Sequence, residues 1–115
     1  EFEETGLTPE FIGGHIAPFV QASHLKIALT LQEVVPIATN GTQLVIGEVS
    51  YVICKKSVIQ PDGYIDIEAL NAITISGIDS YHSTSRQSRL AYPKPKQSAE
   101  KIALNGQRLQ DAILT

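Results

Sequence analysis

A polar segment in the C-terminal third concentrates side chains that could bind a ligand. Residues 76–88 contain Tyr81, His82 and Arg86 among several serine and threonine hydroxyls. Phenol, imidazole and guanidinium groups are hydrogen-bond donors, and loops of this composition often bind anions or polar molecules. The alternative is a solvated surface loop without a ligand, and the residues taken alone favour that alternative.

The other chemically capable residues form no known catalytic or metal-binding pattern. His15 and His24 have no carboxylate or cysteine partner at metal-ligand spacing, so no metal site is expected. Cys54 is the single cysteine, and its place in an apolar run favours a buried thiol over a nucleophile. There is no G-x-S-x-G elbow, no GKS or GKT phosphate loop and no dinucleotide fingerprint. No catalytic residue is therefore assigned.

The best-specified stretch is a long apolar run in the middle of the chain, at residues 44–54. Its residues are apolar or β-favouring on both parities, which predicts a central strand covered on both faces. Gly47 within it indicates a bulge or the close approach of another backbone or a ligand. Residues 25–32 alternate in polarity and predict a preceding strand. Asn40-Gly41 predicts a type I′ hairpin between the two, whose ladder is limited by Pro36.

Turns and short helices are expected on either side of these strands. Pro61-Asp62-Gly63 predicts a turn, and Asp66 should cap a short helix that runs to about Ile73. Residues 1–7 look like the end of a helix stopped near Gly6, and the chain, which has no methionine, may be read as a fragment.

A terminal helix is predicted at the other end of the chain. Ser98 would be its N-cap, and Ile102, Leu109, Ile113 and Leu114 would form its apolar stripe.

Composition limits the classes of protein that the chain can belong to. Its 115 residues with 43% hydrophobic content suffice for a single domain with one core. A net charge of −3 and few basic residues beside aromatics disfavour a nucleic-acid-binding barrel. No run approaches the length of a membrane span and no signal peptide is recognised, so a cytoplasmic protein is the default expectation.

Four segments in order carry a family resemblance: FEETGLTP (2–9), LVIGEV (44–49), PDGYIDIEAL (61–70), and GIDSYH with RLAYPKP (77–95). Together they resemble the C-terminal half of the flavin reductase-like, FMN-binding split-barrel family. The resemblance implies a mainly β fold with short helices, a split β-barrel that is incomplete in this chain, and a homodimer that binds FMN near its interface. It also implies a protein roughly twice as long.

The chain departs from the family in two respects. The N-terminal half, which supplies much of the flavin and phosphate contact in relatives through an Asn-x-Ala-Pro-type segment, has no counterpart here. Gln43 stands where many relatives have a histidine, so no nicotinamide-binding role is carried over to that position.

The resemblance makes residues 77–86 the expected flavin-contacting region. Tyr81 could stack on or hydrogen-bond an isoalloxazine edge, while His82 and Arg86 could donate to its carbonyls or to phosphate. The first hypothesis is an NAD(P)H-dependent flavin reductase or a related oxidoreductase that uses FMN, with FAD as the variant cofactor. The alternative is a non-catalytic FMN-binding electron carrier, or a structural split-barrel fragment that pairs with another chain.

Overall fold

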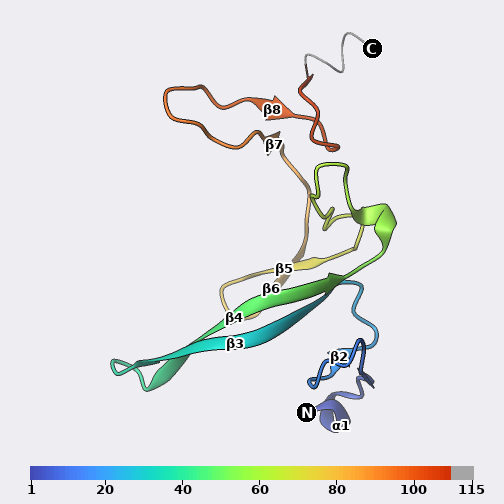
Figure 1. Ribbon diagram of the computed structural model, residues 1–115, viewed down its shortest axis with the longest axis vertical. Coiled ribbons are helices and arrows are strands. Elements are labelled where there is room, and N and C mark those ends of the chain that lie inside the picture. The colour runs from blue at the N-terminus through green and yellow to red at the C-terminus, as the bar shows by residue number, and fades with distance from the viewer. Residues whose placement is uncertain (110–115) are drawn as a thin grey trace. The chain divides into compact units, whose positions relative to one another are not determined.

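The computed structural model describes residues 1–109 and is mainly β with little helix (Figure 1). Its contacts divide the chain into two compact units, Glu1–Cys54 and Lys55–Thr115. The elements are, in order, α1 (Phe2–Thr5), β1 (Pro9–Glu10), β2 (Phe19–Val20), β3 (Lys26–Ile37), β4 (Thr42–Ile53), η1 (Lys56–Val58), β5 (Ile73–Ser76), β6 (Ser80–Ser83), β7 (Arg89–Leu90) and β8 (Lys101–Ile102). None of the helices in this part of the chain has the length and apolar character needed to cross a membrane.

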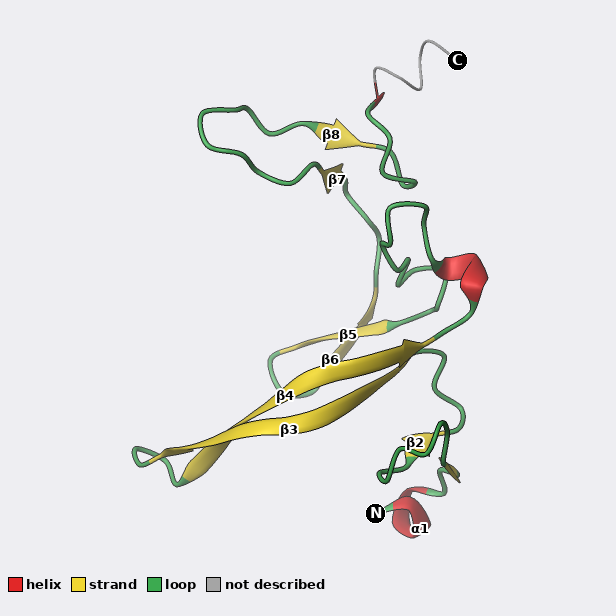
Figure 2. Ribbon diagram, in the orientation of Figure 1, coloured by secondary structure: helices red, strands yellow, loops and turns green. Residues whose placement is uncertain are grey.

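The strands pair as four separate antiparallel two-stranded sheets, β1–β2, β3–β4, β5–β6 and β7–β8 (Figure 2). No sheet among the described residues closes on itself. The mainly β prediction is confirmed, and the sheets are open as expected for an incomplete barrel.

The β3–β4 hairpin dominates the first unit. Its register shifts twice, once between Ala28 and Leu29 and once beyond Leu31, where Leu31 faces Gly47. A Cβ added at Gly47 would lie 3.2 Å from the Cβ of Leu29. The predicted close approach therefore occurs at Gly47, while the bulge lies on the opposite strand, where Gln32 is left without a strand-pairing partner.

The hairpin turn differs from the predicted type I′ turn. Residues 38–41 connect the strands, and Gly41 has φ 68° while Asn40 does not have a positive φ. The Asn40 side chain accepts a hydrogen bond from the Thr42 N–H at 3.1 Å, which makes it a turn-stabilising side chain. Pro36 pairs with Gln43, so the ladder runs past the proline that was expected to limit it.

The prediction that residues 44–54 form a central strand is wrong for the described chain. β4 pairs only with β3, and Leu44, Val45 and Val49 are each more than half exposed. These apolar side chains, on both faces of β4, are therefore largely not packed against other residues of this unit. Cys54 is half-buried, less covered than the predicted buried thiol.

An aromatic cluster connects the N-terminal loop to β4. The Tyr51 hydroxyl donates to the Ile12 carbonyl at 2.9 Å, and His15 and Phe19 lie 6.0 and 6.4 Å from the Tyr51 ring. Phe19 is buried here. The predicted helix end is confirmed, since α1 stops at Gly6, which has φ 70°.

The second unit contains the predicted Pro-Asp-Gly turn but only one turn of the predicted helix. Gly63 donates to the Gln60 carbonyl at 2.8 Å and has φ 86°. Asp66 accepts from the Glu68 and Ala69 N–H groups at 3.1 and 3.4 Å, which is the expected cap. The helix through Ile73 is wrong, because Asn71 adopts φ 54° and β5 begins at Ile73.

The predicted C-terminal helix is wrong over residues 98–108. Lys101 and Ile102 form β8, which pairs with β7, and Gly106 adopts φ 88° in a turn. The expected stripe residues Ile113 and Leu114 lie outside the described residues.

Candidate functional site

The predicted polar loop is largely a hairpin. Ile75 pairs with Tyr81 and Thr74 with His82, and Gly77, with φ 60°, permits the turn. Successive strand residues project to opposite faces. Tyr81 therefore shares a face with the isoleucines of β5, whereas His82 shares a face with hydroxyl side chains.

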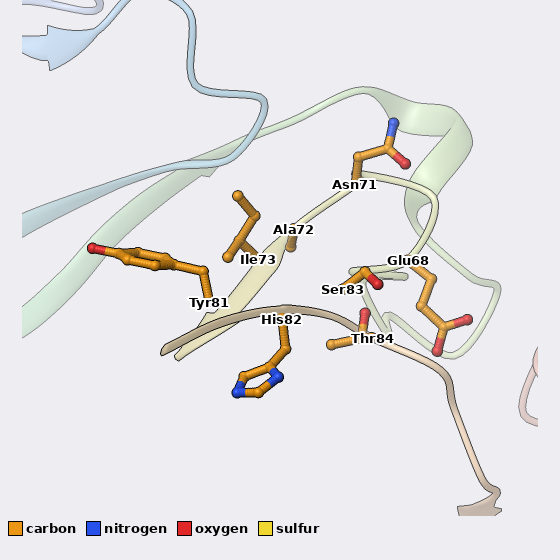
Figure 3. Close-up of a pocket in the computed structure, with 8 residues that line it drawn as sticks. All are labelled: Glu68, Asn71, Ala72, Ile73, Tyr81, His82, Ser83 and Thr84. Carbon is orange, nitrogen blue, oxygen red and sulfur yellow. The ribbon is translucent and has the colours of Figure 1, made fainter. Parts of the chain in front are cut away.

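A cavity of about 340 Å³ lies against this hairpin. It is lined by residues from the capped turn and from both strands (Figure 3): Glu68, Asn71, Ala72, Ile73, Tyr81, His82, Ser83 and Thr84. The lining combines apolar surface with hydroxyl, amide, imidazole and carboxylate groups. Such a mixture suits a flat heteroaromatic ligand with polar edges.

The His82 ring is fixed by a contact across the hairpin. Its Nε2 lies 2.8 Å from the Ser76 Oγ, and the serine hydroxyl can act as donor or acceptor. This bond restricts the orientation of the imidazole without consuming its other nitrogen, Nδ1. His82 can therefore offer a positioned nitrogen to a ligand.

Arg86 does not line the cavity. Its Nη2 lies 2.6 Å from Asp66 Oδ1 and 3.8 Å from Glu68 Oε1. Hydrogen bonding to Tyr64, followed by the charges of Glu68 and Asp66, raises the pKa of Arg86. Tyr81 and His82 thus both line the cavity, although their side chains project to opposite faces of the hairpin (Figure 3), whereas Arg86 lies outside the lining and contacts two carboxylates of the capped turn.

A second arginine, Arg89, also contacts the segment that carries Asp62 and Tyr64. Arg89 Nη2 lies 2.5 Å from Asp62 Oδ2, and its guanidinium carbon lies 4.1 Å from the Tyr64 ring centroid. The hydrogen bond from Arg89 lowers the pKa of Asp62. Arg89 also donates to the Leu104 carbonyl. The loop that carries the cavity residue Glu68 is therefore held by two arginines from the following segment.

Several cavity residues escaped the sequence analysis. Glu68 and Asn71 both fell inside the predicted short helix and were not singled out. The available signal was Asn71 itself, since asparagine tolerates the left-handed conformation that ends a turn. Ser83 and Thr84 belonged to the polar segment but were not distinguished within it.

No family model and no curated protein matches the chain. A crystal structure from Shewanella frigidimarina NCIMB 400, described as that of a candidate flavin reductase with a split barrel domain, matches at a TM-score of 0.76 and 43% identity.

The match covers 80% of this chain but only 46% of the Shewanella protein, so the chain spans just under half of that protein's length. Identity at this level extends the similarity beyond the fold. The resemblance predicted from the sequence is confirmed, as is the incomplete split barrel, because in sequence and fold this chain is similar to part of a protein described as a candidate flavin reductase with a split barrel domain.

Proposed function

We propose that the chain contributes a flavin-binding surface to an FMN-dependent oxidoreductase, with NAD(P)H-dependent flavin reduction as the reaction. The observation that carries the proposal is the cavity beside β6, whose lining includes both Tyr81 and His82. The similarity to a candidate flavin reductase supports it.

The cavity residues fit the ring system of a flavin better than its phosphate. A volume of about 340 Å³ is at the lower end of ligand-sized pockets. Its hydroxyl, amide and imidazole groups can bond the carbonyls and nitrogens of an isoalloxazine. Its lining contains no lysine or arginine, and Arg86 already neutralises Asp66. The phosphate would therefore need cations from outside this lining.

The protein's share of the reaction is binding, orientation and exclusion of water. A bound flavin would supply the hydride-accepting ring. Tyr81 would stack on the ring or bond its edge, and Ile73 would cover its apolar part. His82, oriented by Ser76, would donate to a ring carbonyl. Arg86 would not contact the flavin itself; it would position the turn that carries Glu68.

A homodimer is the assembly that we propose for the full protein. Leu29, Leu31 and Val49 leave apolar surface uncovered on the β3–β4 hairpin, and β4 has a free edge within the described chain. Exposed edges of this kind are normally covered. FMN rather than FAD, and a cytoplasmic location, remain predictions.

The test is FMN titration followed by flavin fluorescence, comparing the unchanged chain with Tyr81→Ala. Loss of one aromatic contact should weaken binding by about tenfold. Ile78→Ala is the matched control, because Ile78 is exposed on the same hairpin and does not line the cavity. Equal FMN affinity in both variants would contradict the proposed site.

A non-catalytic FMN carrier, or a fragment that pairs with another chain, is the second candidate. The observation that favours it is the cavity lining, which holds no lysine or arginine for the phosphate of a flavin. Bleaching of the bound flavin by NADH or NADPH would support the reductase. A flavin that stays oxidised would support the carrier, and a chain that takes up no FMN would support the structural fragment.

A further inference from the structure

The loop between β7 and β8 is a long excursion of the chain (Figure 1), and a second cavity, of about 250 Å³, lies against it. Its walls come almost entirely from one continuous segment, and the lining residues are Leu90, Ala91, Tyr92, Pro93, Lys94, Gln97, Ser98, Ala99 and Glu100. We call residues 91–100 the β7–β8 loop. None of its residues takes part in the cavity beside β6.

This loop is locally basic on an acidic chain. Lys94 lines the cavity, Lys96 lies in the turn between the two lining stretches, and Lys101 begins β8. Among the described residues, these three lysines form no ion pair. The loop's one carboxylate, Glu100, faces Arg108 at 3.8 Å. Positive charge is therefore available here on a chain whose net charge is −3.

The loop is also organised before any ligand arrives. Ala91 donates to the Glu100 carbonyl at 2.8 Å and closes the base of the loop, and Gln97 donates to the Lys94 carbonyl at 3.3 Å across its tip. Pro93 restricts the backbone further. A preformed loop loses less conformational entropy when it binds a ligand.

Lys96 occupies a position where glycine is normally preferred. The turn formed by residues 94–97 has proline at its second position, and Lys96, at the third, has φ 62°. A left-handed residue at this position is the mark of a type II turn, for which glycine is the usual choice. A lysine kept in a strained conformation points to a use for its side chain.

An exposed aromatic ring accompanies the charges. Tyr92 is 87% exposed and lines the same cavity as Lys94. A ring beside lysines can stack on a nucleobase while the ammonium groups hold phosphates. We propose that the β7–β8 loop binds the phosphate-bearing part of an adenine nucleotide, with Lys94 and Lys96 on the phosphates and Tyr92 on the base. Its identification with the adenylate half of NAD(P)H rests on the proposed function.

The test is calorimetric titration of the full chain with ADP in the absence of flavin. Lys94→Gln combined with Lys96→Gln should weaken ADP binding by at least tenfold, and added salt should weaken it further. Lys55→Gln combined with Lys56→Gln removes the same charge from the same unit outside the loop and should leave the affinity within twofold. Equal losses in the two double variants would overturn the proposal.

Two further measurements separate the parts of the proposed site. Tyr92→Leu should weaken ADP binding but leave pyrophosphate binding unchanged; equal effects on both probes would overturn the stacking role. Lys96→Gly removes the strain together with the charge, so it should raise the melting temperature while weakening ADP binding. Unchanged ADP affinity in Lys96→Gly would overturn the role of Lys96. These ADP measurements are made without flavin, so they test the β7–β8 loop even if FMN does not bind at Tyr81.

Discussion

Replacing Gly106 by alanine should destabilise the second unit for a reason that only the three-dimensional structure shows. A Cβ at this position would lie 2.8 Å from the Cβ of Asp62 and 2.6 Å from its Cγ. Contacts this short between carbon atoms require a shift. Rotation of the Asp62 side chain cannot provide it, because the Asp62 Cβ is fixed to its own backbone.

The magnitude has two parts that a matched variant can separate. Alanine in the left-handed region costs about 1–2 kcal/mol. Gly63 has φ 86° and Gly106 φ 88°, but a Cβ at Gly63 would meet nothing within 4 Å. Gly63→Ala should therefore show the backbone cost alone. Gly106→Ala should add the overpacking cost of about 1–3 kcal/mol.

Urea unfolding followed by circular dichroism measures both losses. The free energy of unfolding should fall by about 1–2 kcal/mol in Gly63→Ala and by about 2–5 kcal/mol in Gly106→Ala. Asp62→Gly removes the obstructing Cβ, so combining it with Gly106→Ala should give less than the sum of the single losses. Asp62→Ser keeps that Cβ and should give no such relief. Equal losses in the two glycine variants would refute the reasoning.

Three more predictions follow from individual side chains. Tyr51→Phe removes the hydroxyl bond to the Ile12 carbonyl and should lower the free energy of unfolding by about 1 kcal/mol, measured in urea; an unchanged midpoint would contradict it. Asp62→Asn should flatten the acid limb of the stability curve. The hydrogen bond from Arg89 lowers the folded pKa of Asp62 below 3.8, so its contribution is present above that value and is lost as the pH falls through the lowered one. Asp66→Ala removes the capping bonds of the turn together with the Arg86 ion pair and should lower the melting temperature through a loss of at least about 1 kcal/mol, whereas Glu68→Ala removes only the longer Arg86 contact and keeps the cap.

The sequence predicted local structure well wherever one residue type decides the backbone. Gly6 and Gly63 lie at left-handed positions, as the helix end and the Pro-Asp-Gly turn required, and Asp66 makes its capping bonds. These features depend on interactions within a few residues, so a single sequence contains the information that specifies them.

The wrong predictions concern elements whose identity depends on distant partners. Residues 98–108 have helical spacing, but Arg89 and Leu90 draw Lys101 and Ile102 into a strand pair. The segment containing Tyr81 looked like a loop because its polar residues hide the two-residue period. The cross-strand bond between His82 and Ser76 has no signature in sequence spacing. Tertiary pairing overrides local propensity in each case.

The β3–β4 hairpin shows that a sequence can specify an environment that its own described residues do not supply. Apolar side chains on both faces of β4 predict that other parts of the protein pack against both faces. That prediction was wrong for the described residues because β4 has only one neighbouring strand there. More than two fifths of the surface is exposed to solvent in each of Ile27, Leu29 and Val52. Removing such surface from water stabilises by about 25 cal/mol per Å², so evolution retains it where something covers it. The pattern of residues 44–54 is therefore evidence that this hairpin is covered in the complete assembly.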